Sequence, residues 1–318
     1  MLRNILVTAA NGEIAEAIAR ILADAFPEAR RHGIDASGTW PGEASFETMA
    51  LVPHADDPDY PSALLAASNG VAADIVIPCS EPEILRISWE DELAERLPLV
   101  MVRRELAQVF CDKLETARWL EQHELPTAST VPLLEATGEM LPLVVKPRIG
   151  SGSRGLTIVD NAQLLMGLQD ALGNDAIAQT YLPEANAEFT CVAVRIRGQV
   201  RSLVLRRKLD AGRTIEAVVE EQPEIVRIVI GIAEAADLEG SINIQLRLHE
   251  GQPRVFEINP RFSSTVLMRH LIGFRDLEWT LAGLYGHSPP PFSPPINTVV
   301  YRLNREIVRW PDGHTTST

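Results

Sequence analysis

Lys146 begins a stretch whose residue types suit the binding of phosphate groups. The stretch holds cations, glycines and serines in close succession: Lys146, Arg148, Gly150, Ser151, Gly152, Ser153, Arg154 and Gly155. Glycine adopts positive φ without strain and lets backbone N–H groups approach an anion, while the cations supply charge. The spacing differs from that of a P-loop, because no helix-opening Gly-Lys-Ser/Thr follows. We therefore expect a phosphate-binding loop between two strands, with an ordinary glycine-rich hairpin as the alternative.

A second polar pattern predicts an antiparallel hairpin further along the chain. Residues 242–248 and 254–261 alternate apolar and polar side chains, and residues 249–253 between them are polar or turn-forming. This pattern places Leu248 opposite Arg254. Outward from that pair, the next polar side chains are expected to meet on one face of the hairpin, because side chains alternate along a strand.

Three of these side chains form a candidate metal site. Gln245 is predicted to face Glu257, and Asn259 follows Glu257 on the same face. A carboxylate and two amide oxygens are hard ligands suited to Mg²⁺, which completes its shell with water and substrate phosphates. Arg261 follows as a planar donor for a phosphate or a developing acyl phosphate. A solvated polar face of the hairpin is the alternative interpretation.

The elements that must position these residues begin with a βα unit. A buried parallel strand is predicted at 4–8 and an amphipathic helix at 13–25. A later strand at 75–78 ends close to Glu81, at the sheet edge where ligands bind in open α/β sheets. A nicotinamide-binding Rossmann domain is the rival interpretation of this half. Against it, the first turn offers one glycine, Gly12, where the dinucleotide fingerprint needs three.

The rest of the chain is predicted to form a second, mixed region. One helix over 105–121 carries Lys113, and residues 126–182 have the pattern of a compact α+β lid. A later hairpin carries Arg206 and Arg207, whose charge can receive a substrate carboxylate. A solvated strand edge protected by cations is the alternative for these arginines.

Together these motifs resemble the ATP-grasp superfamily, in its carbamoyl-phosphate-synthase-like branch of carboxylate–amine ligases. The resemblance extends over nearly the whole chain and rests on strings in the family's order: Ile75–Glu83, Cys111–Leu114, Val144–Gly155, Gln179–Leu182, Glu188–Thr190 and Phe256–Arg261. Two positions depart from the pattern. The family more often has an acid where this chain has Gln179, and many relatives have glutamate where it has Gln245.

The resemblance implies a fold and a division of the chain. Residues 1–102 are expected to form an N-terminal Rossmann-like, pre-ATP-grasp α/β domain. Residues 103–318 are expected to form an ATP-grasp domain with a mobile lid subdomain at about 126–182. The expected fold class is therefore α/β plus α+β. A lid closing over ATP would exclude water from a reactive acyl phosphate.

The resemblance also implies roles for single residues. The residues expected to bind ATP are Lys113, Lys146, Arg148, Gly150, Ser151, Gly152, Ser153, Arg154, Gln179, Tyr181, Leu182 and Glu188. Mg²⁺, with Mn²⁺ as an alternative ion, is expected at Gln245, Glu257 and Asn259. The expected catalytic residues are Arg261 and Lys146. The expected substrate contacts are Glu81, Arg206, Arg207 and Ser263.

The implied reaction is that of an ATP-dependent carbon–nitrogen ligase. A substrate carboxylate attacks the γ-phosphate of ATP, and an amine then attacks the acyl phosphate to form an amide. Two other classes stay open: a carboxylase or carbamoyl-phosphate-type enzyme that uses bicarbonate, and a non-catalytic ATP-binding protein. The expected partners are a small-molecule carboxylate and a small-molecule amine. Because relatives in the family commonly dimerise, a homodimer is a further expectation.

Composition agrees with this interpretation. The 318 residues are 46% hydrophobic, which suffices for a sizeable core. The net charge of −14 argues against a general nucleic-acid binder, so any anion site must be local. Three cysteines, Cys79, Cys111 and Cys191, lack metal-like spacing and predict a reducing, cytoplasmic location. No stretch has the length and apolarity of a membrane span, so no membrane association is expected.

Overall fold

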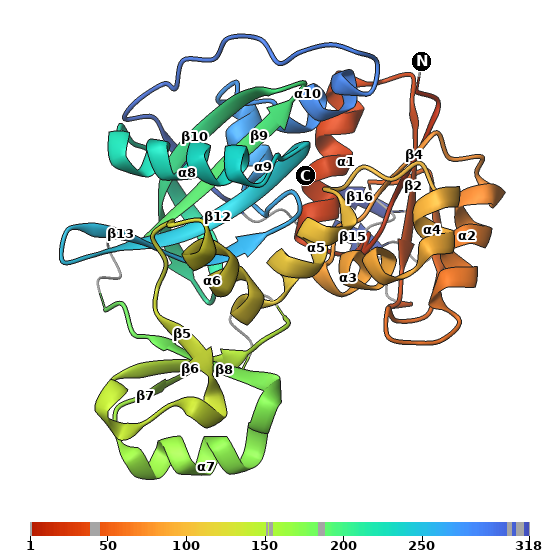
Figure 1. Ribbon diagram of the computed structural model, residues 1–318. Coiled ribbons are helices and arrows are strands. Elements are labelled where there is room, and N and C mark those ends of the chain that lie inside the picture. The colour runs from red at the N-terminus through yellow and green to blue at the C-terminus, as the bar shows by residue number, and fades with distance from the viewer. Residues whose placement is uncertain are drawn as a thin grey trace.

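The computed structural model describes residues 2–38, 45–150, 152, 155–183, 188–303, 307–309 and 315–317. Within these residues the chain forms one parallel and several antiparallel sheets with helices packed against them (Figure 1). The predicted α/β plus α+β class is confirmed. In the described part of the chain, none of the helices combines the length and apolar character needed to cross a membrane.

The N-terminal sheet is parallel and buried on both faces. Its strands are β1 (Asn4–Val7), β2 (Arg30–Asp35), β3 (Thr48–Leu51) and β4 (Ile75–Ile77), in the order β3-β2-β1-β4. Helix α1 (Glu13–Ala25) packs on one face, and α2 (Tyr60–Gly70) packs on the other. The last three residues of β1, Ile5, Leu6 and Val7, are apolar and buried, as expected for a parallel strand covered on both sides. The predicted strand and helix of this βα unit are confirmed.

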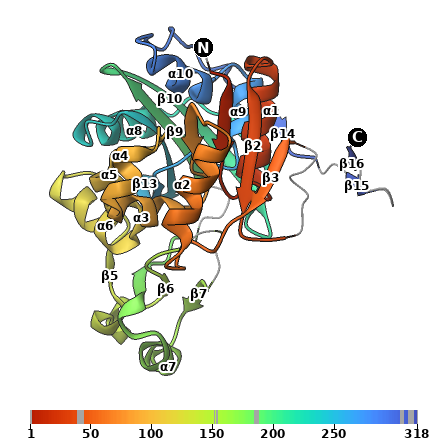
Figure 2. The same cartoon turned by 90° about the vertical axis from the view of Figure 1, so that its right-hand side faces the viewer.

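A small antiparallel sheet forms the lower part of the molecule in Figures 1 and 2. Its strands are β5 (Thr130–Pro132), β6 (Leu143–Pro147), β7 (Thr157–Val159) and β8 (Ala176–Thr180), in the order β5-β8-β6-β7. Helix α7 (Ala162–Leu172) covers one face of this sheet, and three short 3₁₀ helices lie at Leu133–Glu135, Gly138–Met140 and Gly173–Asp175. Leu143 and Val145 point toward α7, so Val144 and Lys146 point away from it.

The largest sheet has six strands. They are β9 (Glu188–Ile196), β10 (Gln199–Asp210), β11 (Arg213–Val219), β12 (Gly240–His249), β13 (Gln252–Asn259) and β14 (Val299–Tyr301), in the order β13-β12-β9-β10-β11-β14. One face packs against α5 (Arg104–Cys111), α6 (Lys113–Gln122) and α8 (Pro223–Ala235). The other face is covered in part by α9 (Val266–Leu271) and α10 (Asp276–Gly283). The uncovered part of that face carries the polar residues singled out above.

Two further helices and two short strands complete the described elements. Helices α3 (Glu81–Trp89) and α4 (Asp91–Arg96) follow β4, while β15 (Ile307–Arg309) and β16 (Thr315–Ser317) pair near the C-terminus. Figure 2 shows this last pair apart from the main body.

The prediction of a single helix over 105–121 is wrong. The segment forms two helices, α5 and α6, with Asp112 between them in an extended conformation (φ −103°, ψ 117°). The Asp112 carboxylate accepts hydrogen bonds from the backbone N–H groups of Leu114 (2.9 Å) and Glu115 (3.3 Å). Aspartate favours this N-cap role because it satisfies donors that a helix start leaves unpaired. Lys113 is therefore the first residue of α6.

The loop of the β12–β13 hairpin is shorter than predicted. It turns at two residues, Glu250 and Gly251, with φ of 52° and 76°. Positive φ at both positions is typical of a type I′ turn, whose twist matches that of the strands. As a result Leu248 pairs with Pro253, and the predicted pairing of Leu248 with Arg254 is wrong.

A β-bulge restores the predicted register further along the same hairpin. The register shifts between Gln245 and Leu246, so that Gln245 lies opposite Glu257, as predicted. The extra residue on β13 is Phe256, which falls between the partners of these two residues. A bulge of this kind re-aims nearby groups. The carbonyl of Phe256 accepts from a side chain outside the sheet, at 3.3 Å from Lys146 Nζ.

Candidate active site

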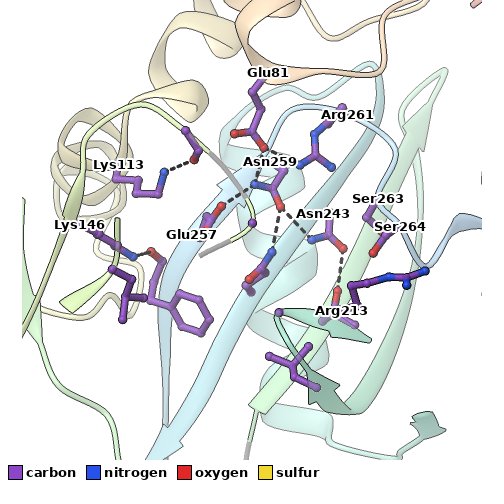
Figure 3. A pocket seen from close by; sticks show the side chains of 18 of the residues that line it. Glu81, Lys113, Lys146, Arg213, Asn243, Glu257, Asn259, Arg261, Ser263 and Ser264 are labelled. Atoms are coloured by element: carbon purple, nitrogen blue, oxygen red, sulfur yellow. Dashed lines mark hydrogen bonds and ion pairs between the residues drawn. The ribbon is translucent and has the colours of Figure 1, made fainter. Parts of the chain in front are cut away.

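A pocket of about 670 Å³ lies where the three sheets meet. It is lined by the start of α1, the residues after β4, the start of α6, the strands β6 and β8 of the small sheet, and the uncovered face of the six-stranded sheet (Figure 3). Six cations and four carboxylates are among its described lining residues: Lys113, Lys146, Arg207, Arg213, Arg247, Arg261, Glu13, Glu81, Glu188 and Glu257. The pocket is thus locally cationic in a chain of net charge −14. A cavity of this size accommodates a cofactor-sized molecule.

Lys146 is buried on the pocket face of β6. Its Nζ donates to Gln179 Oε1 on β8 at 2.9 Å and to the Phe256 carbonyl at the bulge. Burial lowers the pKa of Lys146 to about 8, against a smaller upward effect of Glu257. This lysine is held in place between two sheets, and no carboxylate of the described residues is bonded directly to its charge.

Lys113 approaches the same pocket from the start of α6. Its Nζ donates to the carbonyl of Gly150 at 2.5 Å, and its backbone N–H donates to the carbonyl of Arg148. The Asp112 cap also receives the guanidinium of Arg148, whose Nη2 lies 2.6 Å from Oδ2. The side chain of Arg148 therefore points to Asp112 and is not among the described residues that line the pocket.

The glycine-rich stretch leaves room for a ligand. Gly150 and Gly152 line the pocket with φ of 135° and 72°, and a Cβ added at either would meet nothing within 4 Å. This open, glycine-permitted backbone fits the approach of an anion. Ser151, Ser153 and Arg154, which were also expected here, lie outside the described residues.

Gln179 and Leu182 line the pocket, whereas Tyr181 between them does not. The Gln179 amide is fully engaged, because its oxygen accepts from Lys146 and its nitrogen donates to Thr130 Oγ1 at 2.8 Å. These contacts fix the amide orientation at the position where the family more often has an acid.

Glu188 is buried at the start of β9 and pairs with two arginines. Arg207 Nε lies 2.9 Å from Oε1, and Arg247 Nε lies 2.8 Å from Oε2. Arg207 also donates to Gln245 Oε1 at 2.8 Å. Sequence reasoning missed Arg247. Its alternation with Gln245 along β12, which puts both on one face, was the signal that would have found it.

Gln245, Glu257 and Asn259 lie together on the pocket face, joined by a further amide, Asn243, that the sequence analysis overlooked (Figure 3). Asn259 Oδ1 accepts from Asn243 Nδ2 and from Gln245 Nε2, both at 3.1 Å. Asn259 Nδ2 donates to Glu257 Oε1 at 2.8 Å and to Glu81 Oε1 at 2.9 Å. One amide thus links the hairpin to the residue that begins α3.

The two carboxyl groups bridged by Asn259 have opposite pKa shifts. Burial raises the pKa of Glu81, and the neighbouring Arg261, at 2.7 Å, only partly offsets this effect. Burial also acts to raise the pKa of Glu257, but Lys113 and Lys146 outweigh it, so the net pKa is lowered. Glu257 is therefore ionised in the folded protein. Pairs of carboxyl groups whose pKa values are shifted in opposite directions are common at functional sites.

The donor set fits a magnesium ion in part. Glu257 supplies an ionised carboxylate beside Lys113 and Lys146, and a hard cation requires a ligand of this kind. The oxygen of Asn259 is occupied by two amide donors, and that of Gln245 by Arg207. These two amides fit as ligands only after those bonds are exchanged. Among the described residues, no group of three or more His, Cys, Asp or Glu side chains is arranged to hold a metal ion.

Three of the four residues expected to contact substrate line the pocket, and one does not. Glu81, Arg207 and Ser263 line the pocket. Arg206 does not, because the alternation of β10 sends it to the opposite face, where it pairs with Glu220. The expectation that both neighbouring arginines serve one site is therefore wrong for Arg206.

A buried ion pair supports the loop that carries Ser263. Arg269 pairs with Asp276 at 2.7 Å, and both side chains are 1% exposed. Arg269 Nη1 also donates to Ser263 Oγ at 2.7 Å and to Thr265 Oγ1 at 3.2 Å. Because Arg269 holds the Ser263 hydroxyl in place, the loop that lines the pocket here is fixed by buried hydrogen bonds.

Comparisons with known proteins connect this geometry to a family. Residues 173–304 match the family described as "ATP-grasp in the biosynthetic pathway with Ter operon". One curated relative, the uncharacterized protein MG011 homolog of Mycoplasma pneumoniae, is 29% identical over 86 residues. That match spans 27% of this chain and 30% of the relative's length.

Solved structures cover far more of the chain. N5-carboxyaminoimidazole synthetase from Staphylococcus aureus, complexed with ADP, superposes with a TM-score of 0.73 at 16% identity, over 94% of this chain and 80% of that one. The L-amino acid ligase from Bacillus licheniformis gives 0.68 at 21% identity, over 88% and 73%. The biotin carboxylase domain of Hydrogenobacter thermophilus 2-oxoglutarate carboxylase, a dimer in complex with MgADP, ADP and bicarbonate, gives 0.73 at 16% identity, over 91% and 71%. Residues 173–304 thus match an ATP-grasp family, and the chain as a whole has the fold of the ligases and carboxylases named above.

Proposed function

We propose that this protein is an ATP- and magnesium-dependent carboxylate–amine ligase. It forms an amide through an acyl phosphate and releases ADP and phosphate. The observation that supports this most strongly is the convergence of Lys113, Lys146, Glu257 and Arg261 in one pocket beside an open glycine-rich loop. Phosphoryl transfer depends on positioning and charge neutralisation more than on a covalent enzyme group. The pocket contains charged groups suited to both tasks.

The reaction proceeds in two steps. A carboxylate oxygen of the first substrate attacks the γ-phosphorus, the bond to the bridging β–γ oxygen breaks, and ADP leaves. The amine nitrogen then attacks the acyl carbon, a C–N bond forms, and the C–O bond to phosphate breaks with its electron pair on phosphate. The amine loses a proton in this step. In this proposal Arg261, which pairs with Glu81 at 2.7 Å, holds the transferring phosphoryl group.

The nucleotide lies against the lysine end of the pocket in this proposal. Lys113 and Lys146 bind its phosphates, together with backbone N–H groups around Gly150 and Gly152. The segment Gln179–Leu182 and the acid Glu188 bind the nucleoside. Glu257 holds Mg²⁺, with Asn259 and Gln245 as further ligands after their amide bonds exchange. A bound Mg²⁺ supplies neutralisation of phosphate charge.

The remaining proposals concern the whole chain. We propose that residues 1–102 and 103–318 act as two domains and that residues 126–182 form a mobile lid. The small sheet with α7 supports the lid, because these elements form a separate sheet that packs around a hydrophobic core of its own. Three free, buried cysteines support a reducing, cytoplasmic location. A homodimer is supported only by the dimeric state of one similar structure.

The test is ATP consumption in the presence of magnesium with pooled carboxylic acids and pooled amines. We expect ADP and phosphate to appear only when both pools are present, because the acyl phosphate is consumed by the amine. The pools can then be subdivided to identify both substrates. Release of AMP and pyrophosphate would contradict the acyl-phosphate mechanism. ATP binding without turnover would favour a non-catalytic ATP-binding protein.

A bicarbonate-using carboxylase is the second candidate. The biotin carboxylase domain that superposes on this chain holds bicarbonate, and this similarity supports the carboxylase as a candidate. Bicarbonate alone would stimulate ATP turnover by a carboxylase of this type and leave a carboxylate–amine ligase idle. The same assay, run with bicarbonate in place of the acid pool, separates the two candidates.

A further inference from the structure

The pocket has two ends with different chemistry. Figure 3 shows Lys113 and Lys146 on one side and Arg213, Ser263 and Ser264 on the other. The second end is built from the start of α1, the tip of the β10–β11 hairpin and the loop that follows Arg261. With the nucleotide at the lysine end, this second end is the part of the pocket left for an acceptor.

Arg213 differs from the other cations that line the pocket. Each of the others donates a hydrogen bond to a described partner: Lys113, Lys146, Arg207, Arg247 and Arg261. The Arg213 side chain makes no hydrogen bond with the described residues and is held only by an ion pair, with Nε 3.4 Å from Glu13 Oε2. Its side chain is 53% exposed. Its guanidinium donors are therefore available to a ligand.

Glu13 is shared between two arginines. Besides Arg213 it pairs with Arg302, which is closer and whose side chain is 14% exposed. If Arg213 turned to a ligand, Glu13 would keep its second partner, so no buried charge would be left alone. An exposed ion pair such as Glu13–Arg213 contributes little stability, and its exchange for a ligand carboxylate is correspondingly easy.

We propose that Arg213 binds a carboxylate carried by the amine acceptor, which makes the acceptor an α-amino acid. This inference rests on the proposed ligase function. A guanidinium recognises a carboxylate through two parallel N–H···O bonds, which fix orientation as well as position. Held in this way at the hairpin tip, the acceptor presents its amine toward Arg261, where the acyl group is activated. Arg213 is thus a specificity-determining residue for the second step.

The position of Arg213 follows from the hairpin's turn. Asp210 pairs with Arg213 across Ala211 and Gly212, whose φ values are 46° and 79°. This two-residue turn puts Arg213 at the first position of β11, and Leu209, Ala211 and Gly212 line the pocket beside it. The tip therefore lies over the acceptor end.

The test compares L-α-amino acids with their carboxamides as acceptors, using the acid identified from the pools. We expect the wild-type enzyme to use the amino acids and to discriminate strongly against the carboxamides. Arg213→Gln should raise the KM for the amino acid about 10- to 100-fold, the loss expected for a charged hydrogen-bonded pair, and should leave the KM for ATP within about twofold. Discrimination against carboxamides should fall in parallel.

Arg206→Gln is the matched control. It removes the same charge from the same hairpin, but Arg206 pairs with Glu220 on the opposite face of the sheet. Both KM values should stay near wild type in this variant. Equal effects of the two substitutions would show that net charge alone matters and would overturn the assignment to Arg213.

Glu13→Gln gives an independent readout. If Glu13 competes with the acceptor for Arg213, this variant should lower the KM for the amino acid. A raised KM would overturn the proposal, since it would mean that Glu13 binds the substrate and that Arg213 only holds Glu13 in place.

A binding assay separates failure of this inference from failure of the ligase proposal. If the wild-type enzyme turns over ATP with amines that lack a carboxylate and ignores amino acids, the ligase stands and the role of Arg213 falls. If no turnover is found, thermal unfolding is followed with a non-hydrolysable ATP analogue, magnesium and each L-amino acid. Stabilisation that Arg213→Gln abolishes and Arg206→Gln retains supports the assignment without the ligase. No stabilisation by any amino acid overturns it.

Discussion

Glu257 is the residue on which the proposed chemistry depends most directly. It is the ionised carboxyl of the pair bridged by Asn259, and Lys113 and Lys146 keep its pKa low. Glu257→Gln preserves the shape of the side chain but removes its charge. We expect kcat to fall by about 100-fold or more, the scale of losing one strong electrostatic contact, and the magnesium concentration needed for half-maximal rate to rise. Initial rates over a magnesium series at saturating ATP measure both quantities.

The control for this substitution is Glu220→Gln. Glu220 also pairs with an arginine, Arg206, but that pair lies off the pocket. Its rate and magnesium dependence should match wild type. Unchanged magnesium dependence in Glu257→Gln would remove Glu257 from the metal site.

Lys146 should couple ATP binding to proton uptake. Burial lowers its pKa to about 8 in the free protein, whereas bound phosphates favour the charged lysine and raise the pKa. At pH 8.5, where much of Lys146 is neutral before binding, the complex should therefore take up protons, and ATP affinity should fall as pH rises above about 8. Calorimetric titration in buffers of different ionisation enthalpy measures the uptake.

Lys146→Arg separates this effect from other titrations. Arginine stays protonated throughout the range, so the uptake at pH 8.5 should disappear in this variant. Equal uptake by the variant and the wild type would assign the proton to another group.

At the scale of elements, the break between α5 and α6 connects the helix to the glycine-rich stretch. Asp112 caps α6 and pairs with Arg148, and the first residue of α6 bonds to the backbone of Arg148 and Gly150. Asp112→Ala removes the cap and the ion pair, so we expect it to lower the free energy of unfolding by about 1–2 kcal/mol. Its KM for ATP should also rise, because the segment around Gly150 loses an anchor.

Asp112→Asn distinguishes the two contributions. Asparagine is a comparable N-cap but carries no charge, so this variant should keep most of the stability while losing part of the contact with Arg148. Urea unfolding with an unchanged slope measures the difference. Equal losses in both variants would assign the effect to the ion pair.

The same elements show how far sequence reasoning reached. Alternation along the strands put Gln245 and Glu257 on one face correctly, even though the turn and the pairing of Leu248 were wrong. A shorter turn and a bulge, each shifting the register by one residue, offset one another. Local sequence does not reveal a bulge at Phe256, and the contact made there is tertiary, since the Phe256 carbonyl accepts from Lys146 on another sheet. The break at Asp112 was readable, since aspartate is a preferred N-cap.

The error on Arg206 has a different origin. Arg206 and Arg207 are adjacent, and in a strand adjacent side chains point to opposite faces, so only one of them can line the pocket. That rule was available from the sequence alone. The partners of these arginines, Glu220 and Glu188, were not, because they come from the loop after β11 and from β9.

At the scale of the whole molecule, strand β7 and the residues on either side of the glycine-rich stretch expose apolar side chains. Ile149, Leu156 and Ile158 are 46%, 42% and 49% exposed, and Leu156 lines the pocket. Exposed side chains of this size are suited to a surface that becomes covered when a lid closes. The contacts that join this part to the body include the hydrogen bonds of Lys146 and Gln179 to the Phe256 carbonyl, at 3.3 and 3.4 Å, and that of the Ala128 backbone N–H to the Val255 carbonyl, at 2.8 Å.

These features predict that a bound nucleotide orders one part of the chain more than the rest. Addition of a non-hydrolysable ATP analogue with magnesium should slow hydrogen exchange in residues 143–182, because phosphate contacts at Lys146 and the glycine-rich stretch tie the small sheet to the body. The parallel sheet at 4–77 serves as the internal control and should change little. Lys146→Met should abolish the protection while leaving exchange in the control sheet at wild-type level. Protection spread evenly over both sheets would argue against a lid, since it would mean that nucleotide stabilises the molecule as one unit.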